Sequence, residues 1–356
     1  MRLPFLSKSQ ALVGIDIGSS CVKVAEVALR PKGFELVAAG TAPMPPEAIV
    51  QGAFLNSSAI VEAIGAALAA AGTKTKRVAT AVSGHSVIVK KITLPAMTRE
   101  ELEESIRWEA EQYIPFDINE VNLDFQILQH GESDGQMDVL LVAAKKDLID
   151  DYVAVLGEVG LVPAVIDVAA FAAANCYRAT CEPGAEEVVA LVNIGAQTTN
   201  INILANGVPA FTRDVSAGGN QYTEEIQKTL TVGFEEAERI KLGKSPESDG
   251  QEVVPQEVED AIQTVNESVI GEIQRSLDFF QATSAESRIS RIVVAGGSAK
   301  VSGLIKLFHE RSQIPVERLN PLARMLPSSR FAPEFLDDLG PALGVCLGLA
   351  LRKAPS

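Results

Sequence analysis

The sequence predicts an α/β fold of two lobes, each built from a mixed sheet with flanking helices. The first observation is length, because 356 residues exceed one ordinary domain of roughly 150 residues. The second is a repeat: residues 14–24 (GIDIGSSCVKV) return in outline as residues 191–201 (LVNIGAQTTNI), about half the chain later. The third is a pair of helices rich in alanine and glycine, at residues 166–176 and 339–350. Small side chains let two helices cross closely, as a hinge between lobes requires.

The composition is that of a folded globular protein and excludes several classes of function. Apolar residues make up 47% and charged residues 22% of the chain, which rules out wholesale disorder. The net charge of −15 opposes a general electrostatic grip on nucleic acid or an anionic membrane. With only thirteen Phe, four Tyr and one Trp, base-stacking platforms are not expected either.

Targeting signals and metal-binding patterns are also missing from the sequence. The longest apolar stretches, residues 59–71 and 342–350, are shorter than the ~18–20 residues that span a bilayer. Residues 1–10 contain no apolar core of a secretory signal, so we expect a cytoplasmic protein. The histidines and cysteines show no metal-ligand spacing, and we expect the cysteines to be free thiols. These residues are His85, His130, His309, Cys21, Cys176, Cys181 and Cys346.

Each copy of the repeat predicts a strand, a tight turn and a second, alternating strand. Such a turn presents several backbone N–H groups close together without bulky side chains, which suits a phosphate. One glycine turn of this kind is often an ordinary β-turn, whereas two facing each other would clasp a polyphosphate. The candidate phosphate-binding residues are Gly18, Ser19, Ser20 and Lys23 in the first turn, and Gly195, Gln197, Thr198 and Thr199 in the second. Asp16, on the first strand, is the candidate Mg²⁺ ligand, acting through the water shell of the ion.

Three further segments are candidates for nucleotide contact. A buried strand at residues 291–295 runs into two glycines, which allow close approach of a flat group such as adenine. A Glu and a Lys lie one helical turn apart in the second half, where a solvated ion pair is the alternative. The third segment is another glycine pair, which lies between the second turn and the Glu–Lys pair; a simple turn is the alternative there. In order, the residues of these segments are Gly296, Gly297 and Lys300; Glu238 and Lys241; and Gly218 and Gly219.

Each lobe is expected to carry an additional unit between its strands and its connecting helix. In the first lobe, Thr98 and Glu101 form a capping box, and the helix that they start stops at Pro115. Strand-like and helical segments follow it. We therefore predict a first lobe over residues 1–185 with an α+β insert at about 92–165, and a second lobe over residues 186–356 with a sub-lobe at about 220–288.

Taken in order, these motifs resemble the actin and sugar-kinase ATPase superfamily: two phosphate turns, two connecting helices and an adenosine segment. The insert narrows the resemblance to the PilM family of type IV pilus assembly proteins, through Leu94-Pro95, Tyr113-Ile-Pro-Phe116 and Ala143-Ala-Lys145. The sequence is similar to a lesser degree to the cell-division protein FtsA. FtsA-like chains continue to an amphipathic membrane anchor, whereas this sequence ends shortly after Leu351.

The resemblance implies an actin-like fold of duplicated ribonuclease-H-like lobes that binds ATP and Mg²⁺. In many superfamily members the second phosphate turn contributes an Asp, whereas here the matching residue is Asn193. An amide supplies no negative charge, so the metal should depend on Asp16, and hydrolysis should be weak or absent; the alternative role of Asn193 is to hold its turn. An active ATPase or small-molecule kinase is the rival function, with Asp167 as its candidate base. We expect Asp167 instead to cap the connecting helix that it precedes.

The resemblance also implies partners and a location. The family binds the cytoplasmic N-terminus of PilN and links the inner-membrane platform to the pilus assembly ATPases that serve twitching motility. The chain would thus be cytoplasmic and peripherally associated with the inner membrane, and the sequence leaves self-association open. We place the peptide groove at the seam between the first lobe and its insert, beside strand 87–94, Leu102, Ile106 and residues 113–116. The alternative is that these side chains are simply the core of the insert.

Overall fold

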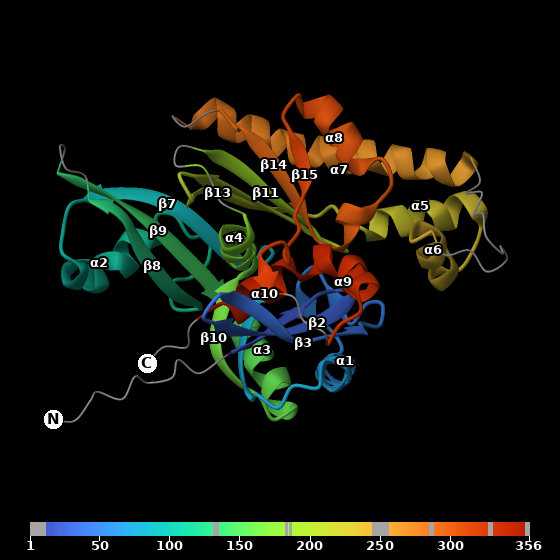
Figure 1. Cartoon of the computed structure of the whole chain (residues 1–356). Coiled ribbons are helices and arrows are strands. Elements are labelled where there is room, and N and C mark those ends of the chain that lie inside the picture. The colour runs from blue at the N-terminus through green and yellow to red at the C-terminus, as the bar shows by residue number, and fades with distance from the viewer. Residues whose placement is uncertain are drawn as a thin grey trace.

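The computed structural model shows two mixed sheets with two helices between them and a smaller sheet at one side (Figure 1). It describes residues 12–130, 135–181, 184, 187–243, 256–284, 288–326 and 330–352. Residues 1–10, in which the sequence shows no secretory signal, lie outside the described residues. Among the described residues, no helix is both long and apolar enough to cross a membrane.

The first sheet has the strand order β10–β6–β1–β2–β3–β16. Its strands are β1 (Val13–Ile17), β2 (Cys21–Arg30), β3 (Gly33–Pro43), β6 (Arg77–Val82), β10 (Val162–Val168) and β16 (Met325–Leu326). β1 pairs antiparallel with β2 and parallel with β6, and β6 pairs parallel with β10. The apolar sides of α1 (Ser57–Ala71) and α3 (Lys146–Glu158) pack against one face, in the same core cluster as Ile15. A short hairpin of β4 (Ile49–Val50) and β5 (Ala53–Phe54) follows β3.

The second sheet has the order β13–β12–β11–β14–β15. Its strands are β11 (Val188–Ile194), β12 (Thr199–Ala205), β13 (Val208–Val215), β14 (Arg291–Ala295) and β15 (Val316–Arg318). The helical elements of this half are α5 (Asn220–Leu230), α6 (Phe234–Lys241), α7 (Gln256–Thr283), the 3-10 turn η1 (Gly297–Lys300) and α8 (Leu304–Ser312). A stripe of apolar residues along α7 is buried against the sheet, from Val258 to Phe280.

The sequence repeat is a repeat in the structure. β1 with β2 and β11 with β12 are antiparallel pairs, and β1 and β11 each pair in parallel with a later strand. Both turns close with the same bond: the Gly18 N–H donates to the Cys21 carbonyl at 3.1 Å, and the Gly195 N–H to the Thr198 carbonyl at 3.0 Å. The predicted two-lobed α/β fold is therefore confirmed.

The insert is a three-stranded sheet of order β7–β9–β8 with one helix. It comprises β7 (Val87–Pro95), α2 (Arg99–Glu111), β8 (Val121–His130) and β9 (Gln136–Lys145). The capping box is present, since the Glu101 N–H donates to Thr98 Oγ1 at 3.2 Å and the Thr98 N–H to the Glu101 carboxylate at 2.7 Å. The predicted bounds of 92–165 begin inside β7 and run into β10. β10 pairs with β6 of the first sheet, and α3 packs in the core cluster of that sheet. Both therefore belong to the first lobe proper, and the insert ends earlier than predicted.

Two helices with small side chains, α4 (Ala169–Thr180) and α10 (Gly344–Ala350), lie between the two main sheets (Figure 1). α9 (Pro333–Leu339) and the 3-10 turn η2 (Gly340–Leu343) precede α10. The helices cross so closely that a Cβ added at Gly348 would lie 1.7 Å from the Ala172 carbonyl oxygen. Asp167 does not cap α4 as predicted: its carboxylate accepts the adjacent Val168 N–H at 2.8 Å, and the N-cap residue Val168 makes no side-chain cap bond. The cause is that the strand continues to Val168, so α4 begins later than the sequence suggested.

Candidate functional site

The first turn of the repeat places a half-buried ion pair beside its backbone N–H groups. The Lys23 ammonium lies 3.0 Å from Asp16 Oδ2. Burial alone would lower the pKa of Lys23, but the Asp16 carboxylate outweighs it, and the pKa lies well above its ordinary value. Lys23 is therefore a fixed positive charge at the turn. Ser19 is half-buried and Ser20 exposed.

The second turn is the meeting point of three predicted segments. The Gly219 N–H donates to the Gly195 carbonyl at 2.8 Å, and Ser298 Oγ donates to the same oxygen at 3.1 Å. A Cβ at Gly218 would lie 2.7 Å from that oxygen, and a Cβ at Gly219 would lie 2.5 Å from Ser298 Oγ. Gly296 has a φ of +92°, and a Cβ there would lie 2.3 Å from the Ile194 carbonyl oxygen. At Gly218 and Gly296 the obstructing atoms are backbone, so only glycine fits there. The structure brings the predicted residues Gly195, Gly218, Gly219 and Gly296 together, whereas a Cβ at Gly297 would meet open space.

The predicted pair on α6 lies next to this meeting point. The Lys241 ammonium contacts the Glu238 carboxylate and donates to the Gly219 carbonyl at 3.3 Å. It also donates to Thr223 Oγ1 at 3.0 Å, and that hydroxyl in turn donates to Glu238. Sequence reasoning missed Thr223, which is fully buried on α5. Its position one helical turn after Gly219 was the only available signal.

Two predicted residues face away from the shared site. Thr199 is fully buried, and its hydroxyl donates to the Ala217 carbonyl at 2.7 Å, so it fixes the turn from within. The Lys300 ammonium lies 2.7 Å from the Asp338 carboxylate on α9 and also donates to the Asp338 carbonyl. To reach a nucleotide, Lys300 would have to leave this ion pair.

The two halves of the chain meet beside the second turn. Gln197 Nε2 donates to the Ile49 carbonyl at 3.0 Å, and the Gln51 N–H donates to Gln197 Oε1 at 3.1 Å. The same segment reaches the first turn, because the Met44 N–H donates to the Ser20 carbonyl at 2.9 Å. Residues 44–51 therefore connect the two predicted phosphate turns.

A second contact between the halves was not predicted from the sequence. The Gly84 N–H donates to Asp214 Oδ2 at 2.5 Å, and His85 Nε2 lies 3.4 Å from Ser216 Oγ. With Gln197 and other residues they line a cavity of about 30 Å³, large enough for a water molecule. The sequence does not indicate this role of His85, because the three histidines share no spacing signal. Among the described residues, no cluster of His, Cys, Asp or Glu side chains could hold a metal ion by itself.

Asp167 lies in the same row of the first sheet as Asp16. The register pairs Ala81 of β6 with Asp167 of β10, and Val13 and Ile15 of β1 with Val78 and Thr80 of β6, which brings Asp16 opposite Ala81. Residues in register on parallel strands share a face. Burial raises the pKa of Asp167 above its ordinary value, although Arg352, 3.1 Å away, opposes the shift.

The fold and this arrangement of turns define the class of the protein as an actin-like one, and comparison with solved structures agrees. MreB 5 of Spiroplasma citri bound to AMPPNP matches with a TM-score of 0.50 at 13% identity, over 89% of this chain and 95% of that one. A much stronger match is the PilM-PilN type IV pilus biogenesis complex, with a TM-score of 0.85 at 31% identity, over 98% of this chain and 100% of that one. The family model for type IV pilus assembly protein PilM matches residues 14–354. The chain belongs to the PilM family and is an actin-like type IV pilus assembly protein.

Similarity to FtsA covers only part of the chain. FtsA from Neisseria meningitidis serogroup B is 27% identical over 150 residues, which is 36% of this chain and 35% of that protein. The chain thus spans about a third of its FtsA relative. This partial match agrees with the resemblance that the sequence suggested.

Proposed function

We propose that the chain is a nucleotide-binding component of the pilus assembly platform that binds the cytoplasmic N-terminus of PilN. The observation that carries the proposal is the similarity to the PilM-PilN complex over nearly the full length of both chains. Through PilN the protein would sit at the inner membrane and connect the platform with the assembly ATPases.

ATP would bind between the two turns of the repeat. Support comes from the fixed positive charge of Lys23 and from the backbone N–H groups beside Gly18 and Gly195. Gly297 leaves open space at the adenosine segment, and the Glu238–Lys241 pair stands at the meeting point of the glycines. A bound Mg²⁺ would neutralise phosphate charge, and Asp16 is the carboxylate placed to hold it through water.

A thermal-shift experiment tests the nucleotide site. A ligand at a hundredfold excess over its Kd stabilises the folded state by about 2.7 kcal/mol. We expect Lys23→Ala and Asp16→Ala to abolish the ATP-induced rise in the unfolding midpoint. Lys306→Ala, which removes an exposed lysine on α8, is the control and should keep it. A wild-type shift in both site variants would refute the site.

We propose a lining for the PilN groove that differs from the one expected from the sequence. Leu102, Ile106 and Ile114 are all buried in the core of the insert, packed on its own sheet. For these three residues the alternative interpretation applies, namely that they form the core of the insert. The outer strand of the first sheet on the side of the insert is β10 (Figure 1). Val162 on this strand is 58% exposed, and the next four residues are half-buried. Among the described residues, β10 pairs with no strand on its outer side. An extended peptide would add to this edge by strand-type hydrogen bonds, with alternate side chains in pockets.

Calorimetry with the PilN N-terminal peptide tests this edge. Val162→Glu removes an apolar contact and adds charge, so we expect affinity to fall about tenfold or more, as the loss of one buried valine implies. Val208→Glu, at an exposed valine on β13 of the second sheet, is the matched control. Equal losses for both variants would rule out the β10 edge, and absence of binding by the wild type would rule out the partner.

Turnover of ATP is a second candidate function, favoured by the row that Asp167 shares with Asp16. A base at Asp167 must be ionised, and its raised pKa together with Asn193 at the second turn favours weak hydrolysis. Steady turnover of roughly 1 s⁻¹ or more, the low end for ordinary enzymes, that is lost in Asp167→Asn would establish the enzyme. Turnover far below that rate supports a switching or structural nucleotide.

A further inference from the structure

The two connecting helices are each bound by hydrogen bonds to the lobe on the far side of the crossing. α4 follows β10, the outer strand of the first sheet, and α10 follows the last elements of the second half. Both lie between the sheets (Figure 1). If the angle between the sheets changes, each helix should move together with the sheet to which its polar contacts bind it.

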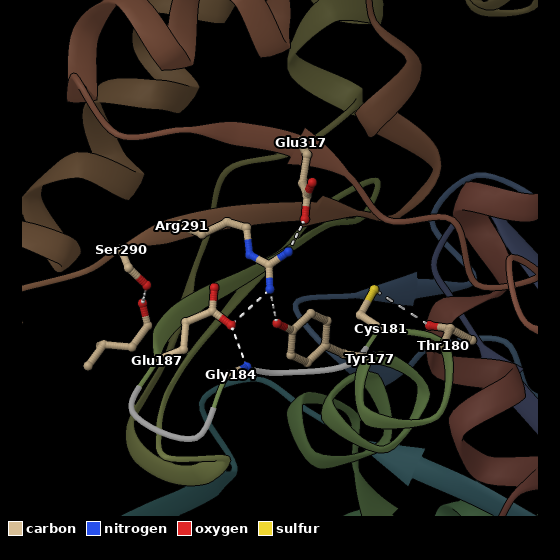
Figure 2. A network of polar contacts seen from close by, with 9 residues as sticks. Tyr177, Thr180, Cys181, Gly184, Glu187, Ser290, Arg291 and Glu317 are labelled. Carbon is tan, nitrogen blue, oxygen red and sulfur yellow. Dashed lines mark hydrogen bonds and ion pairs between the residues drawn. The ribbon is translucent and has the colours of Figure 1, made fainter.

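α4 is fixed to the second sheet at both of its ends. Near its start, the buried Asn202 of β12 donates from Nδ2 to the Ala170 carbonyl at 2.9 Å. Near its end, Arg291 of β14 donates to the Tyr177 hydroxyl at 2.6 Å (Figure 2). The guanidinium is itself held by Glu187 at 2.9 Å and Glu317 at 2.8 Å.

Arg291 therefore forms a rigid node. Its side chain is 24% exposed, which gives its ion pairs more weight than open surface pairs have. Its guanidinium carbon lies 5.7 Å from the centre of the Tyr177 ring, within the range of a cation–π contact. Figure 2 shows β14, β15, the start of β11 and the end of α4 meeting at this one side chain. The end of α4 cannot leave the second sheet without breaking these bonds.

Towards the first sheet, the contacts of α4 are apolar. Its second half, including Tyr177, shares a core cluster with residues of β2 and β3, and its first half meets β6. Ala169, Ala172 and Ala173 pack in one cluster with Ala79 and Ala81 of β6. Alanine surfaces are smooth and have no directional bonds to break. This contact resists sliding much less than the node does.

α10 shows the converse attachment. The Cys346 thiol shares its one S–H between the Gly14 carbonyl at 3.2 Å and the Lys23 carbonyl at 3.3 Å, both on the first sheet. Arg352, just beyond the helix, pairs with Asp167 at the end of β10. The start of α10 still touches the second sheet, where a Cβ at Gly344 would lie 3.7 Å from Ala295 Cβ.

We infer that each connecting helix moves with the lobe opposite to the one it follows in the chain: α4 moves with the second sheet and α10 with the first. A change in the angle between the sheets is then a shear of α4 past α10 at the Ala172–Gly348 crossing. The backbone rotations fall at the two helix starts, Val168–Ala169 and Leu343–Gly344. The inference rests on contacts within the chain and is independent of which nucleotide or peptide binds.

Distance distributions between spin labels test which lobe α4 follows. Genetically encoded labels that leave the four native cysteines untouched are placed at exposed positions on α4 (Arg178), on α8 of the second lobe (Lys306) and on α1 of the first lobe (Glu62). We expect the 178–306 distribution to be narrow, and the 178–62 distribution to be broader or displaced. Equal widths, or a narrower 178–62 distribution, would overturn the inference.

Hydrogen exchange on the unlabelled protein provides an independent test of the node. Tyr177→Phe removes only the hydroxyl that Arg291 holds. We expect exchange at residues 173–181 to rise about tenfold, the effect of one net hydrogen bond, with β1 and β6 unchanged. Tyr222→Phe, which removes a buried hydroxyl bonded to Asn266 inside the second lobe at 2.8 Å, is the control. If it raised exchange in α4 equally, or if Tyr177→Phe did not, the node would not hold the helix.

Discussion

Replacing Gly348 by alanine tests the crossing of the two connecting helices directly. An added Cβ would lie 1.7 Å from the Ala172 carbonyl oxygen, whereas real Cβ atoms are essentially never closer than 3.0 Å to such a neighbour. The atom in the way is backbone and cannot rotate aside, so the helices would have to separate by more than about 1 Å. Overpacking of this kind costs about 1–3 kcal/mol. We expect the upper end, because the separation would disturb the contacts along both helices.

Glycine-to-alanine exchange also favours a helix, and a second site isolates that effect. Gly65 lies inside α1, and a Cβ there would meet nothing within 4 Å. Gly65→Ala should therefore stabilise the protein by about 1 kcal/mol from helix propensity alone. With the same propensity gain, Gly348→Ala should still lose about 2 kcal/mol, which leaves about 3 kcal/mol between the variants.

Urea unfolding followed by far-UV circular dichroism measures both variants against the wild type. The midpoint should rise for Gly65→Ala and fall for Gly348→Ala. If Gly348→Ala were as stable as Gly65→Ala, the helices would not cross at the distance seen here, and the shear at this crossing would lose its basis.

Two further predictions concern the edges of the candidate site. Burial raises the pKa of Asp167 in the folded state, despite Arg352. The stability that protonated Asp167 contributes is therefore complete below about pH 4 and is lost as pH rises through the folded-state pKa. The unfolding midpoint of Asp167→Asn minus that of the wild type should grow from pH 4 to 7, and a constant difference would contradict the raised pKa. Gly296→Ala, which meets the Ile194 carbonyl oxygen at 2.3 Å in a backbone of positive φ, should lower the free energy of unfolding by more than 1 kcal/mol. Gly297→Ala projects into open space and should stay within about 0.5 kcal/mol of the wild type, so equal effects on urea unfolding would refute the geometry.

The parts of the fold that the sequence predicted are those fixed by local chemistry. Glycine at a strand end, alternating apolar residues and the Thr98–Glu101 capping box each determine structure over a few residues. Because the sequence repeats at half its length, the strand–turn–strand structure predicted for the first copy also applied to the second. For this reason the two sheets, both turns and the small-residue helices could be predicted without any knowledge of contacts.

Most differences between the predictions and the structure concern pairing over long sequence distances, whereas the missing Asp167 cap depends on where β10 ends. The period-two pattern of residues 162–168 reads the same whether the strand pairs inside the insert or, as it does, with β6. Leu102 and Ile106 form an apolar stripe that suits a groove or a core equally, and only the three strands beneath them decide for the core. Lys300 finds its partner Asp338 38 residues later, beyond the reach of any local pattern.

The contrast between local and long-range contacts also explains how the two turns of the repeat differ in charge. Asp16 in the first turn faces Lys23 seven residues away on the paired strand, a contact that the hairpin register sets. The matching residue in the second turn, Asn193, donates to Asn200 at 3.1 Å, which in turn donates to the Asp214 carboxylate at 2.8 Å. That carboxylate also accepts the Gly84 N–H from the other half of the chain. Negative charge is therefore present near the second turn, but hydrogen bonds commit it to holding the two halves together. This supports our proposal that Asp16 would hold the metal and that the site would bind a nucleotide more readily than it would hydrolyse one.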